Sequence, residues 1–175
     1  KGNISRDPSK SLFLNIDNLD LGFLNNISGE RFTGTLNGAA EARDLYNNPY
    51  IQNDLRIKAL TINDFLIGDI NGVNIWNQQD ERFDINFSID RLKIRTVDLK
   101  GFYTPSEPEP LRINAQFNQA NLKIAEPLLE TIFSNMDGTL TGKYLISGSF
   151  LNPKINGNGN IENGQIMINY LKTLY

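Results

Sequence analysis

The sequence predicts a mainly β protein built from antiparallel strands, and three observations carry this prediction. Apolar and polar residues alternate over long stretches, most clearly where Phe83, Ile85, Phe87 and Ile89 are separated by polar residues. Isoleucine, phenylalanine and asparagine are frequent, whereas alanine-rich helical stretches are nearly missing. Asn-Gly dipeptides recur, and these favour the left-handed conformations of hairpin turns. We therefore expect a sheet with one apolar face and one face in water.

Two segments break the alternation and predict short helices. Between Leu19 and Ile27 apolar residues occupy both odd and even positions instead of alternating with polar ones, which predicts a frayed helix. Apolar residues from Ile124 to Phe133 recur at helical spacing, with Pro127 suited to a first turn. Such a helix would bury the apolar end of an open sheet.

Turn signals separate the expected strands. The parity of the apolar residues switches after Ile89, which predicts a turn or bulge before Leu99. The three prolines between Thr104 and Pro110 predict a surface loop. Five dipeptides predict hairpin turns: Asn37-Gly38, Asn71-Gly72, Asn156-Gly157, Asn158-Gly159 and Asn163-Gly164.

The composition excludes several classes of function. The chain of 175 residues has no cysteine and no histidine, which removes thiol nucleophiles, disulfides, histidine bases and the usual zinc ligands. Its net charge of −3 argues against a nucleic-acid surface. The acidic pairs Asp80-Glu81 and Glu107-Glu109 fall in expected surface loops. We predict no enzyme activity, no metal and no cofactor.

The sequence also contains an internal repeat, over residues 14–66 and 118–175. The run Gly34 to Gly38 matches Gly138 to Gly142, and Asn48-Pro49 matches Asn152-Pro153 in the same register. Stacked repeats of this kind form solenoids whose apolar face continues from one block to the next. We expect the 175 residues to be one fragment of a longer solenoid.

The apolar face itself is the candidate binding surface. In a closed sandwich its residues would form an ordinary core, whereas in an open, curled sheet they would line a groove. The predicted groove-lining residues are Leu36, Leu55, Ile57, Phe83, Ile85, Phe87, Ile89, Ile113, Phe117, Leu140, Tyr144, Ile146, Phe150, Ile155, Ile161, Ile166 and Ile168. Asparagines together with aromatic residues give a second candidate, a sugar-binding face, from Trp76, Tyr46, Tyr50 and Tyr103.

The closing stretch resembles the C-terminal region of the TamB family, in the form seen in Bacteroidetes-type members. Three features carry this resemblance: the glycine-spaced strands over 138–142 and 146–150, the pair Asn152-Pro153 with Gly157, and the aromatic end from Tyr170 to Tyr175. The segment 18–49 is similar to the preceding block of that region. The resemblance implies an open, curled β-solenoid trough (β-taco-like) with an apolar interior, belonging to the AsmA-like bridge proteins for lipid transfer.

The same resemblance implies a location and partners. It places the chain in the periplasm of a Gram-negative bacterium, in a protein anchored in the inner membrane that works with an Omp85-type outer-membrane barrel. The cargo would be phospholipid acyl chains or a hydrophobic polypeptide, such as a nascent outer-membrane strand, for outer-membrane biogenesis. A glycan-binding β-sandwich module and a ligand-free structural spacer are two further hypotheses, and no nucleic-acid partner is expected.

Overall fold

The computed structural model describes residues 7, 9–44, 50–126, 133–149, 151–168 and 173–174. The described strands form one antiparallel sheet in which every strand pairs with the next strand in sequence. The elements are, in order, β1 (Ser11–Asp20), the 3-10 helix η1 (Leu21–Leu24), α1 (Asn25–Ser28), β2 (Phe32–Arg43), β3 (Tyr50–Ile62), β4 (Phe65–Asn77), β5 (Arg82–Arg91), β6 (Ile94–Tyr103), β7 (Leu111–Asn121), the 3-10 helix η2 (Leu122–Ala125), β8 (Phe133–Gly148), β9 (Pro153–Ile168) and β10 (Thr173–Leu174). The prediction of a mainly β, antiparallel protein is confirmed, and the single sheet excludes a two-layer sandwich for these strands.

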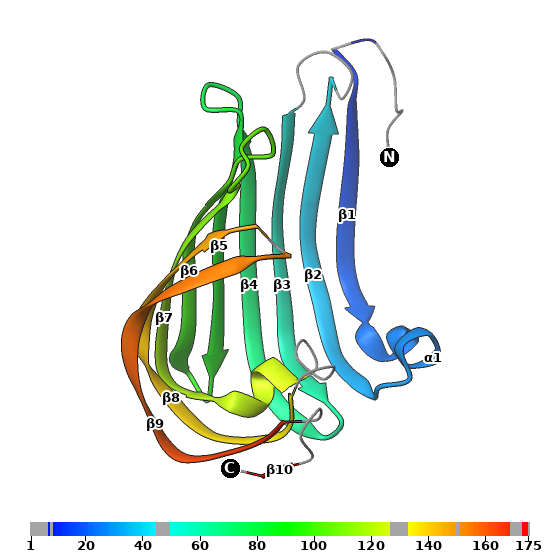
Figure 1. Cartoon of the computed structure of the whole chain (residues 1–175). Helices are drawn as coiled ribbons and strands as arrows, with labels where there is room; N and C mark the ends of the chain where they lie inside the picture. Colours follow the sequence, from blue (N-terminus) through cyan, green and yellow to red (C-terminus); the bar gives the residue numbers. More distant parts are fainter. Residues whose placement is uncertain are drawn as a thin grey trace.

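The sheet is open and strongly curved. Figure 1 shows β8 and β9 bending round in front of the middle strands, while the short helices lie at one end of the sheet. Val97 of β6 and Ile155 of β9 line one cavity although two strands separate them in the sheet order. Because neighbouring strands lie about 4.8 Å apart, a flat sheet would keep these side chains too far apart to share a cavity.

One face of the sheet carries rows of apolar residues that are direct cross-strand partners. Residues that face each other across antiparallel strands project to the same side of the sheet, so each row stays on one face. The first row, from β2 to β7, is Leu36, Ile57, Ile70, Ile89, Val97 and Phe117. The next, from β3 to β8, is Leu55, Gly72, Phe87, Leu99, Ala115 and Tyr144. We call this side the apolar face.

The short helices cover one end of the apolar face. Leu21 of η1 is 4% exposed and belongs to a packed cluster with Leu60, Ile89 and Val97. Ile124 of η2 packs against the same cluster. The predicted helical break between Leu19 and Ile27 is confirmed by η1 and α1, although β1 runs to Asp20. The second predicted helix falls mainly on residues 127–132, which lie outside the described part of the chain; η2 precedes that segment and Phe133 begins β8.

The prediction that Asn-Gly dipeptides form the hairpin turns is wrong. All five lie inside strands, in β2, β4 and β9. At Gly38, Gly157 and Gly159 the close approach of the neighbouring strand requires glycine, and a β-carbon on Gly38 would lie 2.9 Å from the Cα atom of Leu55 on β3. Among the described residues, the β3–β4 turn uses Asn63 and Asp64, and the β5–β6 turn uses Leu92 and Lys93, all four with positive φ.

Two distant parts of the sheet share the same irregularity. In β1, the backbone N–H of Asn18 (φ 51°) donates to the side chain of Asn37 at a bulge in the pairing with β2. In β7, the backbone N–H of Gln119 (φ 48°) donates to the hydroxyl of Thr141 at a bulge in the pairing with β8. In both places the strand then ends in a 3-10 helix, η1 or η2.

The caps of these two helices match as well. Asp20 caps η1 by accepting a hydrogen bond from the N–H of Gly22, and Asn121 caps η2 by accepting one from Lys123. The strands that follow also correspond, since Leu36 pairs with Ile57 in the same way as Leu140 pairs with Ile161. Bulge, cap and pairing therefore occur twice in the same order.

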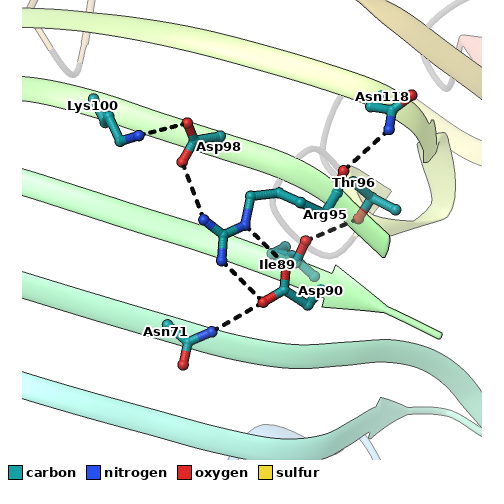
Figure 2. A network of polar contacts seen from close by, with 8 residues as sticks. All are labelled: Asn71, Ile89, Asp90, Arg95, Thr96, Asp98, Lys100 and Asn118. Carbon is teal, nitrogen blue, oxygen red and sulfur yellow. Dashed lines mark hydrogen bonds and ion pairs between the residues drawn. The ribbon is translucent and has the colours of Figure 1, made fainter. Parts of the chain in front are cut away.

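The opposite face of the sheet is held by ion pairs. Figure 2 shows Arg95 of β6 donating to both carboxylate oxygens of Asp90 on β5, at 2.9 and 3.1 Å, while Asn71 of β4 donates to the same carboxylate. On β3 and β4, Lys58 pairs with Asp69 at 2.8 Å. These cross-strand contacts tie β3 to β6 on the polar side of the sheet.

The polar face makes stability depend on pH. The hydrogen bond from Arg95 lowers the pKa of Asp90, and those from Lys58 and the backbone of Ala59 lower the pKa of Asp69. In the unfolded chain the pKa of each carboxyl is about 3.9. Their stabilisation is therefore present above that pH and is lost as the pH falls through the lower folded-state pKa.

We expect the urea midpoint of unfolding to fall between pH 6 and pH 3. Asp90→Asn should remove part of this dependence and lower stability at pH 6 by about 0.5–1 kcal/mol, the size of a solvent-accessible ion pair. Glu107→Gln, in the exposed β6–β7 turn, is the control and should leave the dependence in place. Equal pH profiles for wild type and Asp90→Asn would show that the Arg95 pair does not contribute.

Candidate apolar binding site

A cavity of about 340 Å³ lies on the apolar face, between β6 to β9 and η2. Among the described residues of its wall no side chain is charged, and Asn121 supplies the only side-chain amide. The lining residues are Val97, Phe117, Ala120, Asn121, Leu122, Ile124, Ala125, Met136, Leu140, Tyr144, Ile146 and Ile155. A space of this size and lining suits an apolar ligand.

The end of β7 shapes one side of the cavity. The bulge after Phe117 changes the parity of the strand and places the small side chain of Ala120, which is 5% exposed, against the packed cluster. Asn121 then caps η2, its side-chain oxygen accepting from the N–H of Lys123 at 2.8 Å. This cap turns the chain so that Ile124 reaches both the cluster and the cavity wall.

Tyr144 shapes the opposite side because its ring lies over glycines of β8 and β9. A β-carbon on Gly142 would come within 3.0 Å of the ring and one on Gly157 within 2.9 Å, while one on Gly159 would meet the hydroxyl oxygen of Tyr144. The ring also packs edge to face on Phe117, with 5.9 Å between centroids. These glycines therefore let an aromatic side chain lie flat against the sheet, where it contributes a wall of the cavity.

The apolar face is not sealed. Ile155 and Ile161 on β9 are 66% and 55% exposed, and Leu14 and Leu19 on β1 are 54% and 40% exposed, so the face is uncovered near both edges. The accessible surface of the chain is 11583 Å², whereas a compact monomer of 19.7 kDa would have about 8,600 Å². An exposed apolar area of this kind is typical of a binding surface.

The residues predicted from sequence fall into three groups. Five line the cavity, namely Phe117, Leu140, Tyr144, Ile146 and Ile155. Others pack in or against the cluster under the helices: Leu36, Ile57, Phe87 and Ile89. The remaining described side chains lie elsewhere on the strands and are half-buried, apart from the exposed Ile161: Leu55, Phe83, Ile85, Ile113, Ile161 and Ile166. Phe150 and the side chain of Ile168 lie outside what the structure describes.

Seven of the lining residues are not predicted by the alternation of apolar and polar residues, because they follow irregularities in the strands. Val97, Ala120 and Met136 come after bulges or breaks, where the alternation of the strand changes parity. The others belong to the end of β7 and to η2: Asn121, Leu122, Ile124 and Ala125. The signal that could have located them is the helix-capping Asn121 immediately before an apolar group.

The acidic residues of the surface loops do not come together into a catalytic or metal-binding site among the described residues. Asp80 pairs with Arg82 at 3.2 Å, and Glu109 pairs with Lys154, both on exposed turns. Within the described ranges no group of three or more acidic, histidine or cysteine side chains is placed to hold a metal ion.

Two aromatic residues of the possible sugar-binding face lie in one cross-strand row, since Trp76 pairs with Phe83 and Phe83 pairs with Tyr103. Trp76 packs edge to face on Phe83, with 4.7 Å between ring centroids. Tyr50 projects to the opposite face by the alternation of β3, and Tyr46 lies outside the described part of the chain. The structure therefore groups Trp76 with Tyr103 and not with Tyr50.

Among the described residues, no helix has the length and hydrophobicity needed to cross a membrane. Comparison with known proteins found no matching family model, no matching curated protein and no matching solved structure.

Proposed function

We propose that the chain shelters an alkyl chain, such as a phospholipid acyl chain, in an open, curled β-solenoid trough whose floor is the apolar face. The observation that carries this proposal is the cavity under η2, whose wall, as far as its residues are described, holds a single amide and no charge. Together with the exposed Ile155 at its rim, this wall offers an apolar ligand a way in from solvent.

The size of the cavity matches part of an acyl chain. An engineered apolar cavity of about 150 Å³ binds benzene, and the present one is about 340 Å³. Each methylene removed from water contributes about 0.8 kcal/mol. Several methylenes therefore give measurable binding, and the scarcity of polar groups along the wall leaves the alkyl part of the ligand without a specific polar contact.

The same wall favours an alkyl chain over a polypeptide. A peptide backbone carries one N–H donor and one C=O acceptor for nearly every residue, and burying them without partners is costly. Asn121 already caps η2, so it offers little to a bound backbone. A nascent outer-membrane strand is therefore the less favoured cargo.

The repeated irregularities support the solenoid part of the proposal. The bulge at Asn18, the cap at Asp20 and the pairing of Leu36 all have counterparts about 101 to 104 residues later. Two units with the same order of bulge, helix and strand pair are what a duplicated block over 14–66 and 118–175 produces.

The cellular setting rests on the sequence resemblance. We propose that the chain is a periplasmic section of a TamB-like envelope protein, anchored in the inner membrane and acting with an Omp85-type barrel in outer-membrane biogenesis. The open antiparallel sheet with one apolar face is consistent with that setting. A protein of this kind acts by holding cargo and needs no catalytic residue.

Native mass spectrometry tests the proposal. The chain is mixed with 1-palmitoyl lysophosphatidylethanolamine below its micellar concentration, and we expect a one-to-one adduct because the acyl chain leaves water. Glycerophosphoethanolamine, which has the head group without the acyl chain, should give no adduct. Failure of the lysolipid to bind would contradict acyl-chain binding and favour the spacer.

Two parallel binding measurements distinguish a polypeptide cargo from a sugar ligand. Binding of an amphipathic strand peptide in place of the lysolipid would identify polypeptide as the cargo. Binding to a glycan array that disappears in Trp76→Ala would support the sugar-binding module instead.

A further inference from the structure

Arg91 is a charged residue at the end of an apolar row. It follows Ile85, Phe87 and Ile89 at two-residue spacing on β5, so its side chain projects to the apolar face. Its Cα atom would lie 3.1 Å from a β-carbon placed on Gly68 of β4. The guanidinium carbon lies 5.0 Å from the centre of the Phe65 ring on that face.

The guanidinium of Arg91 is not fully satisfied by the protein. Its Nε atom is buried and has no hydrogen-bond partner within the described part of the chain. Arg95, four residues away on the polar face, has its guanidinium paired with a carboxylate, since it donates to both oxygens of Asp90. A buried donor without an acceptor is costly, and an anionic oxygen is the acceptor that a guanidinium binds best.

A second cation approaches the same ring from η2. The Nζ atom of Lys123 lies 5.8 Å from the centre of the Phe65 ring, and 3.6 Å from Asp137. Lys123 and Phe65 also line a separate cavity of about 410 Å³ that contains Glu30 and Glu126. Those two carboxylates already accept from Asn63 and from the backbone of Asn135.

The two cations lie next to the apolar cavity. Ile89 is the direct partner of Val97, which lines that cavity, and Arg91 lies two residues further along β5, a distance of about 7 Å. On η2, Ile124 lines the cavity and the preceding Lys123 faces Phe65. Both cations therefore lie outside the cavity, at the Phe65 ring, beyond Val97 and Ile124 of its wall.

We propose that Arg91 and Lys123 bind the anionic head group, a phosphate or carboxylate, of the amphiphile whose alkyl chain occupies the cavity. This inference rests on the proposed function and adds to it the direction in which the ligand lies. The head group lies at Phe65, and the chain runs from there towards Tyr144 on β8.

Isothermal titration with decyl phosphate, 1-decanol and inorganic phosphate tests this assignment on the full chain. We expect wild type to bind decyl phosphate on the order of tenfold more tightly than 1-decanol, since a charge-assisted hydrogen bond is added to the same alkyl burial. Arg91→Gln and Lys123→Gln should each reduce that preference and leave the affinity for 1-decanol unchanged. Arg91→Lys should retain part of it.

The matched control is Lys93→Gln. It removes one positive charge two residues from Arg91, in the exposed β5–β6 turn, and should leave the preference as in wild type. Urea unfolding of each variant checks that the sheet is intact.

The outcomes separate this inference from the proposed function. Equal weakening of decyl phosphate and 1-decanol by Arg91→Gln would show a packing role against Phe65 and overturn the head-group site. Binding of inorganic phosphate as tight as that of decyl phosphate would assign the site to free phosphate and also overturn it. Absence of 1-decanol binding in wild type would instead contradict the apolar cavity as an alkyl site.

Discussion

Ile155→Asp should reduce the affinity for 1-palmitoyl lysophosphatidylethanolamine by at least about tenfold. Ile155 lies at the rim of the apolar cavity and is 66% exposed, so a carboxylate there can stay hydrated in the free protein. A bound acyl chain would have to displace that water or leave the cavity. The affinity is measured by native mass spectrometry or by titration calorimetry.

Asn156→Asp is the matched control for this prediction. Asn156 is the next residue on β9 and pairs with Leu145, so its side chain projects to the opposite face of the sheet. It receives the same new charge without touching the cavity, and we expect wild-type affinity. If both variants bound the lysolipid as wild type does, the cavity would not be the acyl site. If both lost binding equally, the effect would come from net charge.

Ile89→Ala should destabilise the protein by about 3 kcal/mol, within the range for removing a buried aliphatic side chain. Ile89 is 4% exposed and lies in the cluster formed with Leu21 of η1 and Val97 of β6. Its loss leaves a void at the point where the short helices pack on the sheet. Urea unfolding at pH 7 measures the change in free energy.

The control for packing is Ile94→Ala, which changes an isoleucine that is 56% exposed at the start of β6. We expect it to cost less than about 1 kcal/mol because little apolar area is buried there. Similar costs for the two variants would mean that the cluster under the helices does not hold the sheet together. A large cost for Ile89→Ala alone supports a packed end beside an open cavity.

The alternation of the sequence located the apolar face but not the cavity. The pattern at Ile85, Ile113 and Ile146 is confirmed by the register, which makes them members of one cross-strand row through Gly101. Period-two alternation is local and can be recognised in each strand separately. The cavity, in contrast, joins Val97 to Ile155, which are far apart in the sequence and separated by two strands in the sheet.

The turns show the limit of local signals in another way. An Asn-Gly dipeptide is suited both to a hairpin turn and to a place where strands approach closely. At Gly157 and Gly159 the second use applies, because the ring of Tyr144 lies against them. Only the neighbouring strand distinguishes the two uses, and a single sequence does not show which residue lies opposite.

The sequence by itself determined which residues share the apolar face within each uninterrupted stretch of strand, because side chains alternate between the two sides of a strand whatever it pairs with. The bulges in β6, β7 and β8 change that parity and became visible only in the pairing. It also determined that neither a thiol nor an imidazole is present. The tertiary structure decided how far the sheet curls, and hence that Ile89 is covered while Ile155 is open. Curvature accumulates from bulges and from close approach at glycines over many strands, so it depends on pairings between distant parts of the chain.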